Sequence, residues 1–426
     1  MANDVVALSA LVGGPLLDSS GGRLGQIQDV VARLDLSDAL PPVVGLKARI
    51  GGRELFVPVA RIEQFGPDLA RTSTTKLNLA QFESRSGEVL LRRDLLHRRV
   101  INVATARLVT AGEVRLVRDG ALWRVAGIES GFGTRFRRLL PRGLRGSGEP
   151  QGERDQDQFV PWHEIELFVA HVPTSRLKLA PRRLARLHPA QIADLVEAAS
   201  HAEGEEIMAA VGHDKELEAD VFEELDDEHQ VEFLRERTDE EVAAVLSRMA
   251  SDDAADLLLE IEQERRLPVL NLLPQGKQAK IRRLLGHNPS TAGGMMNPDF
   301  VSVAADETVA TALRRVRASA LRGQLLSTVC LVDGAGQLVG TVALTELVCA
   351  DPDGSLSSLL EEEAQTPTVG PEADLPEVAR LMTDYNLIAM PVVDADGRPV
   401  GMIAVDDVLE MVLPEEWRRR SAGARQ

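Results

Sequence analysis

The sequence predicts a multidomain α+β protein with β-barrel-like units at its N-terminal end, a helical superhelix in the middle and tandem α/β modules at its C-terminal end. Three observations support this fold class. Residues 1–170 alternate short apolar runs with Gly, Asp and Asn turns, which is typical of strands. Residues 182–286 show helical periodicity and a repeat of about 25 residues. Residues 299–413 contain a second, ungapped internal repeat.

The composition fits a globular chain of about three domains, because 426 residues exceed the usual ~150 per domain about threefold. Aromatic residues make up only 3%, so the cores must be aliphatic. No secretory signal opens the chain, and no window reaches the ~18 apolar residues of a membrane span. We therefore expect a soluble, cytoplasmic protein. We expect both cysteines, Cys330 and Cys349, to be small buried side chains rather than a disulfide framework or zinc site.

The formal charge of -18 is unevenly distributed. The first 155 residues carry 23 Lys and Arg against 17 Asp and Glu, whereas the remainder carries 25 against 49. An acidic C-terminal part argues against nucleic acid as the partner and suits cations. A well-solvated acidic surface would explain the same charge.

The N-terminal region contains a weak echo, in which Phe56–Glu63 (FVPVARIE) recurs as Phe159–Glu166 (FVPWHEIE). We interpret residues 1–170 as two small β-barrel-like units in tandem. The region resembles the PRC-barrel family, and residues 22–30 and 55–58 carry the resemblance. It implies small barrels that dock as adaptors on other proteins. Residues 141–158, which are rich in Pro, Gly, Arg and Asp, are typical of a flexible insertion.

The helical repeat of residues 182–286 follows a linker framed by Pro173 and Pro181. Each unit predicts a helix, a turn and a second helix, and one such hairpin cannot bury its apolar stripe alone. The units should therefore stack as a short superhelix. The acidic pairs 226–227 and 252–253 fall at predicted hairpin turns, where capping of free helix amides would be enough to explain them.

The C-terminal repeat aligns Val329–Asp333 with Met390–Asp394, 61 positions further on. Each copy predicts strand, tight turn, strand and helix, preceded by a helix at 308–320 or 374–384. The pattern resembles the CBS module, with copies at about 299–350 and 364–413 of a region that spans 290–413. CBS pairs tend to associate in twos through their helices, so the resemblance implies a homodimer. Residues 414–426 remain as a tail.

No catalytic motif emerges, because the eight histidines are scattered and neither HExxH nor a phosphate loop occurs. We expect a protein that is not an enzyme. CBS modules that bind adenosine nucleotides carry a Thr or Ser for phosphate and an Asp for the ribose. Here Asp407 matches the ribose contact, but Ala343 and Ala404 replace the hydroxyls and Glu346 replaces the other Asp. Each lost hydrogen bond to a charged phosphate costs ~1.5–3 kcal/mol, so ATP should bind weakly.

A further resemblance spans residues 186–413 and points to the cytosolic portion of the MgtE magnesium transporters. It rests on four stretches, namely residues 188–190, 251–258, 292–296 and 381–394. In that family magnesium ions bridge carboxylates of the helical domain and the CBS pair. By position, the resemblance implies Asp252 as the helical ligand, Asp407 as the CBS ligand and Asp374 as a further acidic position. This sequence lacks the membrane domain, and Pro376 replaces one acidic residue of the family.

These observations predict a regulatory sensor of divalent cations, with Mg²⁺ as the ion. Facing aspartates are sufficient for magnesium, which keeps most of its water and is held by one or two carboxylates. The barrel region would contact a partner such as a membrane transporter, and the protein would then be peripheral to the membrane through that partner. Two alternatives stay open: an energy sensor that binds adenosine nucleotides, and an interaction scaffold without a small ligand.

Overall fold

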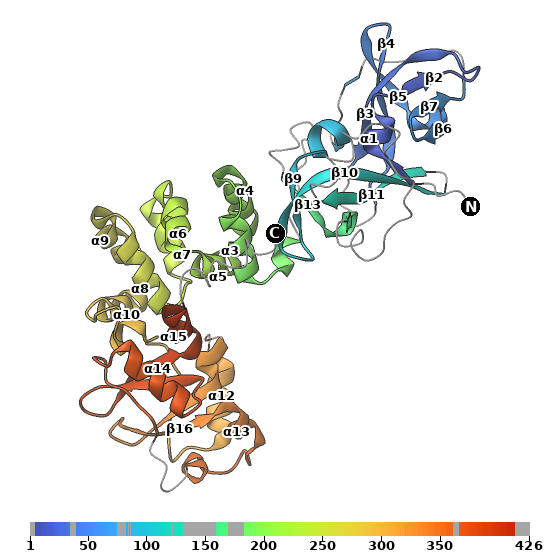
Figure 1. Ribbon diagram of the computed structural model, residues 1–426. Coiled ribbons are helices and arrows are strands. Elements are labelled where there is room, and N and C mark those ends of the chain that lie inside the picture. Colours follow the sequence, from blue (N-terminus) through green and yellow to red (C-terminus); the bar gives the residue numbers. More distant parts are fainter. Residues whose placement is uncertain are drawn as a thin grey trace. The chain divides into compact units, whose positions relative to one another are not determined.

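The computed structural model (Figure 1) describes residues 5–34, 40–74, 82–83, 85, 87–120, 122–130, 159–168, 183–319, 321, 323–360 and 366–413. The predicted insertion at 141–158, the linker prolines and the 414–426 tail lie outside the described residues. The chain divides into two compact units, residues 1–217 and 218–426. Its mixture of sheets and helices confirms the predicted multidomain α+β class.

The first unit contains two mainly antiparallel sheets, which are formed by two similar runs of elements. The first run comprises β1 (Val5–Ala7), α1 (Leu8–Leu11), β2 (Pro15–Leu17), β3 (Arg23–Arg33), β4 (Val43–Ile50), β5 (Arg53–Pro58), η1 (Val59–Arg61), β6 (Ile62–Gly66) and β7 (Leu69–Thr72). The second comprises β8 (Glu88–Leu90), η2 (Leu91–Leu95), β9 (Arg99–Asn102), β10 (Arg107–Asp119), β11 (Leu122–Ser130), β12 (Phe159–Pro161), η5 (Trp162–Glu164) and β13 (Ile165–Leu167). The echoed FVP segments close β5 and β12, each before a short 3₁₀ turn.

The two runs exchange their first strands. Strand β1 pairs with β10 of the second run, and β8 pairs with β3 of the first. One hydrophobic core extends through both sheets, from Val6 to Ile165. The two runs of elements are therefore interlocked around a shared core.

Two buried carboxylates hold the exchanged segments in place. Asp29 of β3 accepts hydrogen bonds from the Arg92 and Arg93 amides of η2, at 2.7 and 3.1 Å. Glu113 of β10 accepts from the amide of Ser9 in α1 at 3.0 Å and also from its hydroxyl. Each carboxylate thus satisfies backbone amides of the helical turn that the other run contributes.

The first unit also holds the start of the helical repeat, namely η7 (Leu184–Arg186), α3 (Pro189–Glu197) and α4 (His201–Val211). Arg99 of β9 joins the sheet to this hairpin, because its guanidinium donates to buried Glu203 at 2.9 Å and to the Ala198 carbonyl at 2.6 Å. The Arg183 guanidinium likewise donates to the Ile165 carbonyl at 2.5 Å.

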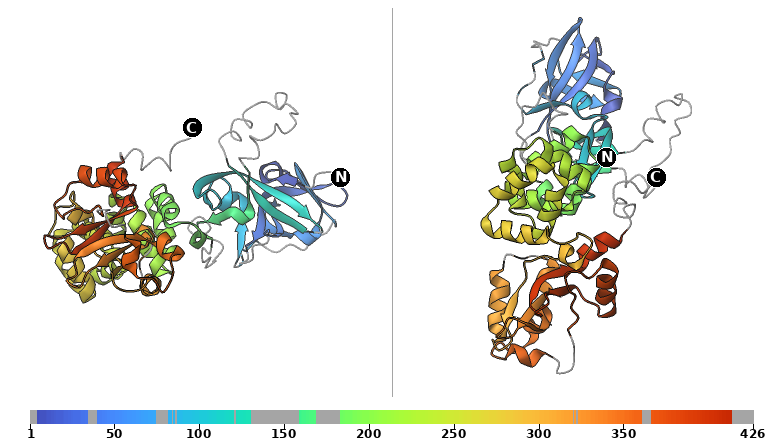
Figure 2. Two further views of the ribbon diagram at one scale, coloured as in Figure 1. Left: turned by 90° about the horizontal axis from the view of Figure 1, so that it is seen from below. Right: turned by 90° about the vertical axis from the view of Figure 1, so that its left-hand side faces the viewer.

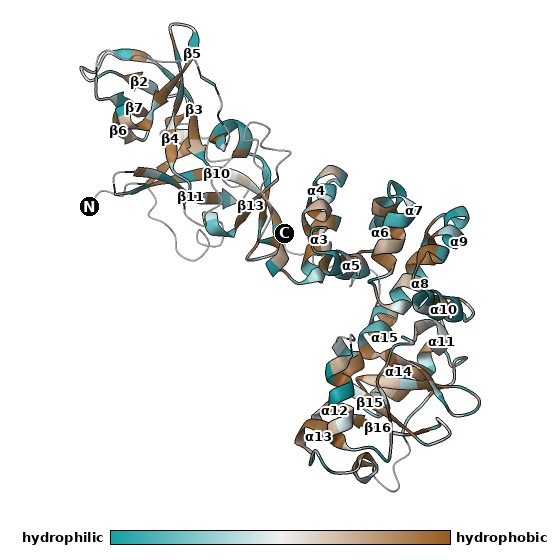
Figure 3. Cartoon of the chain, turned by 180° about the vertical axis from the view of Figure 1, so that it is seen from behind, coloured by the Kyte–Doolittle hydropathy of each residue, from teal (hydrophilic) through white to brown (hydrophobic). Residues whose placement is uncertain are grey.

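The helical repeat continues through α5 (Lys215–Glu224), α6 (Asp227–Arg235), α7 (Asp239–Leu246), α8 (Ser251–Glu260), α9 (Gln263–Leu272) and α10 (Gln275–Leu284). Figure 3 shows hydrophobic residues interleaved with hydrophilic ones along these helices. Asp226 caps α6 by accepting from the His229 amide at 2.9 Å, which confirms the capping role predicted for this acidic pair. In the second unit α7 packs on α9, and α8 packs on α10.

The C-terminal modules follow α11 (Ala292–Met295). The first module contains β14 (Ser302–Ala304), α12 (Val309–Ala318), η8 (Gly323–Ser327), β15 (Thr328–Val332), β16 (Leu338–Ala343), α13 (Leu344–Cys349) and η9 (Leu356–Leu359). The second contains α14 (Leu375–Asp384), β17 (Ala389–Val393), β18 (Pro399–Ala404) and α15 (Val405–Val412). Figures 1 and 2 show these elements beside α8 and α10.

The internal repeat of the modules extends to their turns. The Asp333 and Asp394 carboxylates each accept two backbone amides of their own hairpin turn, at 2.8–2.9 Å. The turns meet, because the Leu338 amide donates to the Gly397 carbonyl at 2.8 Å. Cys330 is buried between the modules, whereas the expectation of a buried Cys349 is wrong, since it is exposed at the end of α13.

Candidate metal centre

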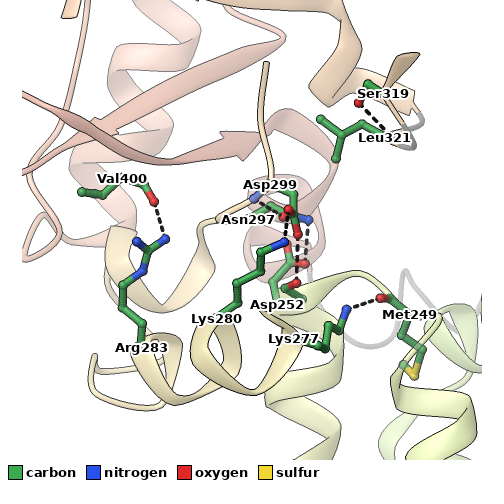
Figure 4. A network of polar contacts seen from close by, with 11 residues as sticks. Met249, Asp252, Lys277, Lys280, Arg283, Asn297, Asp299, Ser319, Leu321 and Val400 are labelled. Carbon is green, nitrogen blue, oxygen red and sulfur yellow. Dashed lines mark hydrogen bonds and ion pairs between the residues drawn. The ribbon is translucent and has the colours of Figure 1, made fainter. Parts of the chain in front are cut away.

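The first turn of α8 carries Asp252, the predicted helical-domain ligand. Asp252 is only 9% exposed, and its Oδ1 accepts a hydrogen bond from Nδ2 of Asn297 at 2.9 Å. The amides at the start of α8 also favour its charged form. Asp252 is not the N-cap of α8, a position that Ala250 occupies. The carboxylate therefore points from the helix end toward the segment that leads into the C-terminal modules (Figure 4).

Asn297 connects this carboxylate to the second module. Its backbone exchanges two hydrogen bonds with Met402 of β18, at 2.8 and 2.9 Å. Strand β18 leads directly into α15, which carries Asp407 in its first turn. A short path of hydrogen-bonded backbone thus fixes Asp252 relative to the strand before Asp407.

Asp407, the predicted ligand from the second module, lies in the field of Asp252. Burial, followed by repulsion from Asp252 and Asp406, raises the pKa of Asp407 to about 8. One oxygen of Asp407 accepts from the Ala404 amide at 3.3 Å, which closes the first turn of α15. Asp252 and Asp407 are therefore close enough for their charges to repel each other.

Other carboxylates surround this pair, and we call Glu223, Asp252, Asp253, Asp256 and Asp407 the acidic cluster. Burial raises the pKa of Asp253 well above its usual range, and Asp252, Glu223 and Asp407 add repulsion. Burial is also the main cause that raises the pKa of Glu223 to about 7. It likewise raises the pKa of Asp252 and that of Asp256 to about 6 each. Five carboxyl groups thus resist carrying their full negative charge together, and a bound cation would relieve that repulsion.

Asp374 lies in a different setting. It is the N-cap of α14, and its Oδ1 accepts from the Glu377 amide at 3.0 Å. Its backbone pairs with Thr291 of the junction. The main electrostatic influences on Asp252 and Asp407 come from other carboxylates and from Lys277. The structure therefore gives Asp374 a capping role, and its role as a metal ligand stays a prediction.

Three members of the acidic cluster were missed by sequence reasoning. Asp253 and Asp256 could have been found, because their spacing from Asp252 places all three within about one turn of a single helix. Glu223 could not, since it lies in the last turn of α5, in the preceding hairpin, and reaches α8 only in the fold. There its Oε1 accepts from the Ala250 amide at 2.5 Å.

The cluster does not form a ready-made metal cage. In the parts of the chain that the structure describes, no three His, Cys, Asp or Glu side chains are grouped closely enough to hold an ion. Magnesium retains water ligands and needs only one or two carboxylates from the protein. Asp252 and Asp407 are the residues that could supply them from two different domains.

Protein side chains also form direct contacts across the same interface. Asp299, just before β14, accepts from the Ser251 hydroxyl at 3.0 Å and pairs with Lys280 of α10. Its amide donates to Oδ1 of Asn297 at 2.9 Å. Direct protein contacts thus hold α8 and α10 on the second half of the unit (Figure 4).

The structure also shows the local role of the two positions that lack a nucleotide-binding hydroxyl. Ala343 and Ala404 precede α13 and α15, and each donates its amide to an acidic side chain of that helix. The acceptors are Glu346, at 3.1 Å, and Asp407. Each acidic group therefore caps the start of its own helix by accepting the N-cap amide, and the alanine has no side-chain acceptor that would complete a capping box.

Comparison with known proteins identifies two types of domain in this part of the chain. Residues 187–290 match the MgtE intracellular N domain, and residues 292–353 and 364–414 match the CBS domain. The chain carries an MgtE N domain followed by a CBS pair. The acidic cluster therefore lies between an MgtE N domain and its CBS pair. The PRC-barrel resemblance of residues 1–170 stays a prediction.

The relatives of this MgtE-type region are magnesium transporters. The magnesium transporter MgtE of Thermus thermophilus is 32% identical over 202 residues, which is 46% of this chain and 44% of that protein. The soluble part of a magnesium transporter is 26% identical, with a TM-score of 0.50 over 54% of this chain and 90% of that one. The cytosolic domain of the Mg²⁺ channel MgtE in complex with ATP is 30% identical, with a TM-score of 0.50, over 54% and 92%.

The chain spans less than half the length of the curated relatives that it matches. Among the described residues, no helix is long and apolar enough to cross a membrane.

Proposed function

We propose that this protein is a non-catalytic regulator that senses Mg²⁺, with one ion bridging Asp252 of the MgtE N domain and Asp407 of the CBS pair. The observation that carries the proposal is the position of these two carboxylates: they come from different domains, lie within each other's field and both resist ionisation. Similarity to proteins described as magnesium transporters supports the choice of ion.

The proposed mechanism is electrostatic. Without the ion, the negative charges of the acidic cluster repel one another and weaken the interface between the MgtE N domain and the CBS pair. With the ion, that repulsion is replaced by attraction, so the compact form gains population in proportion to its extra affinity for Mg²⁺. The interface itself does not depend wholly on metal, since Asn297, Lys280 and Ser251 already cross it.

We also propose where the signal goes. A cytoplasmic protein with an MgtE-type region would act on a membrane magnesium transporter, because the relatives carry this region as the cytosolic part of such a transporter. The interlocked β units would be the adaptor that contacts the partner. Their attachment to the first helical hairpin through Arg99 and Glu203 supports this, because it ties the adaptor to the start of the N domain.

Thermal melting tests the metal proposal. Mg²⁺ at 100 times its dissociation constant should add about 2.7 kcal/mol to the free energy of unfolding of the wild type. Asp252→Asn and Asp407→Asn should lose most of that gain. Asp374→Asn is the matched control, because Asn also caps helices well and the same charge is removed. NaCl at equal ionic strength controls for screening.

Equal gains in the free energy of unfolding for all four proteins, or an equal gain in NaCl, would reject the bridging model. The protein would then be better explained as an interaction scaffold without a small ligand.

Nucleotide sensing is the second candidate, and one observation favours it. A relative of this region was solved in complex with ATP. Against it, Ala343 and Ala404 offer no hydroxyl to phosphate, and Asp407 belongs to the acidic cluster, whose negative charge repels phosphate. The same melt with ATP in place of MgCl₂ separates the two functions. A larger gain with micromolar ATP than with millimolar Mg²⁺ would favour the nucleotide sensor.

A further inference from the structure

Helix α10 presents a row of basic side chains at positions 277, 280 and 283, which lie on one side of the helix. Two of them anchor the interface directly. Lys280 pairs with Asp299, and the Arg283 guanidinium donates to the Val400 carbonyl at 2.7 Å. The third, Lys277, has a different partner.

Lys277 reaches the start of α8. Its ammonium donates to the carbonyl of Met249, which directly precedes the N-cap residue Ala250. The positive charge is thus held at the same helix end that carries Asp252 and Asp253 (Figure 4). Because the hydrogen bond goes to a backbone carbonyl, Lys277 acts on the carboxylates through space.

The acidic cluster and Lys277 stabilise each other's charged forms. Burial lowers the pKa of Lys277, but the negative charges of Asp299, Asp252 and Glu223 oppose that shift. In return, Lys277 favours the ionised forms of Asp252 and Glu223. A half-buried ammonium that compensates several carboxylates has the role that a bound cation would otherwise have.

We propose that the Lys277 ammonium is a tethered competitor of the divalent cation and sets the concentration at which the cation enters the acidic cluster. This inference rests on the proposed function, because it concerns the same site. With Lys277 in place, part of the negative charge is already balanced, and an incoming ion is also repelled by the ammonium. Lys277 is therefore a positioning residue that tunes affinity, and Asp252 and Asp407 remain the ligands.

The expected effect follows from Coulomb's law. Removing one positive charge close to a divalent ion in a partly hydrated site should tighten its binding about tenfold. Lys277→Gln removes the charge and keeps a polar end for the Met249 carbonyl. Lys277→Arg keeps the charge and should bind Mg²⁺ with nearly wild-type affinity.

The test is calorimetric titration of the full-length protein with MgCl₂ at fixed ionic strength. Arg282→Gln is the matched control, because Arg282 lies on the same helix, bonds the exposed Asn271 side chain and carries the same charge. It should shift the affinity less than about twofold. Circular dichroism and the melting temperature in EDTA confirm that each variant is folded.

The outcomes separate the two proposals. Binding by the wild type and about tenfold tighter binding by Lys277→Gln alone supports both. Wild-type binding with Lys277→Gln no tighter than Arg282→Gln overturns this inference and leaves the proposed function. Binding by Lys277→Gln but not by the wild type supports the competitor and rejects the wild type as a magnesium sensor. No binding by any variant rejects both.

Discussion

Asp407 combines two roles at one position of α15. Its carboxylate accepts the Ala404 amide, so the helix start is capped, and its charge is also repelled by that of Asp252. The first role stabilises the start of α15. The second destabilises the folded state whenever the Asp407 carboxyl group is ionised without a counter-charge. A group in this position makes the folded state sensitive both to protons and to cations.

This sensitivity predicts a pH dependence. The pKa of Asp407 is about 8 and that of Glu223 about 7 in the folded protein, against about 4 in an unfolded chain. The folded state therefore holds more protons over this range, so this contribution to stability is full below about pH 4 and is lost as the pH rises through 7 and 8. In EDTA we expect the melting temperature to fall between pH 5 and pH 8.

The fall should be smaller in Asp407→Asn, which has no charge to acquire, and smaller in the wild type with MgCl₂. A wild-type melting temperature in EDTA that rises steadily from pH 5 to pH 8, with the same slope in Asp407→Asn, would contradict this account.

At the scale of elements, the exchanged strands make the N-terminal half depend on two buried carboxylates. Asp29 accepts the Arg92 and Arg93 amides of η2, together with the amide of Val30 at 2.8 Å. These contacts close the junction at which β8 joins the sheet of the first run. The junction is thus as sensitive to a side-chain change as a helix is to the loss of its cap.

Asp29→Ala should therefore destabilise the first unit by about 2–3 kcal/mol, because buried amides lose their acceptor. Asp29→Asn, which keeps one acceptor oxygen, should cost less. Glu63→Gln on the exposed side of β6 is the control. Urea unfolding followed by tryptophan fluorescence measures the difference, since Trp123 and Trp162 lie in the shared core. A loss in Asp29→Ala no larger than in Glu63→Gln would show that the junction does not depend on this carboxylate.

Local sequence patterns predict the helices and the C-terminal modules. They do not predict which distant strands pair with each other. The FVP echo marks equivalent strands because each repeats the same local turn. It does not say that β1 pairs with β10, which depends on contacts more than 100 residues apart. In the site, positions 252 and 407 came from a family resemblance. The roles of Glu223 and Lys277 depend on how hairpins pack, and no single segment contains that information.

At the scale of the whole molecule, apolar side chains remain exposed on the second CBS module. Tyr385 and Ile388, which follow α14, and Leu409 of α15 are each at least half exposed. Helices α14 and α15 pack against each other, so these side chains belong to neighbouring elements. Exposed apolar side chains of this size favour an association surface.

We predict that this surface forms the homodimer that the CBS resemblance implies. Light scattering at micromolar concentration should give about twice the monomer mass of 46.3 kDa. Leu409→Glu should shift the protein toward monomer, because a charge would be buried in the contact. Leu267→Glu, at an exposed position of α9, is the matched control and should remain dimeric. A monomeric wild type, or two variants that behave alike, would contradict this interface.

The central claim is that one ion is shared by Asp252 and Asp407, and a double-mutant cycle on the Mg²⁺-induced stabilisation tests it most directly. The gain in the free energy of unfolding is measured for the wild type, Asp252→Asn, Asp407→Asn and the double variant, each against NaCl at matched ionic strength. If the two carboxylates share the ion, either single change removes most of the gain and the second change removes little more. Losses that simply add, or a double variant that keeps the wild-type gain, would show that the two aspartates do not hold a common ion.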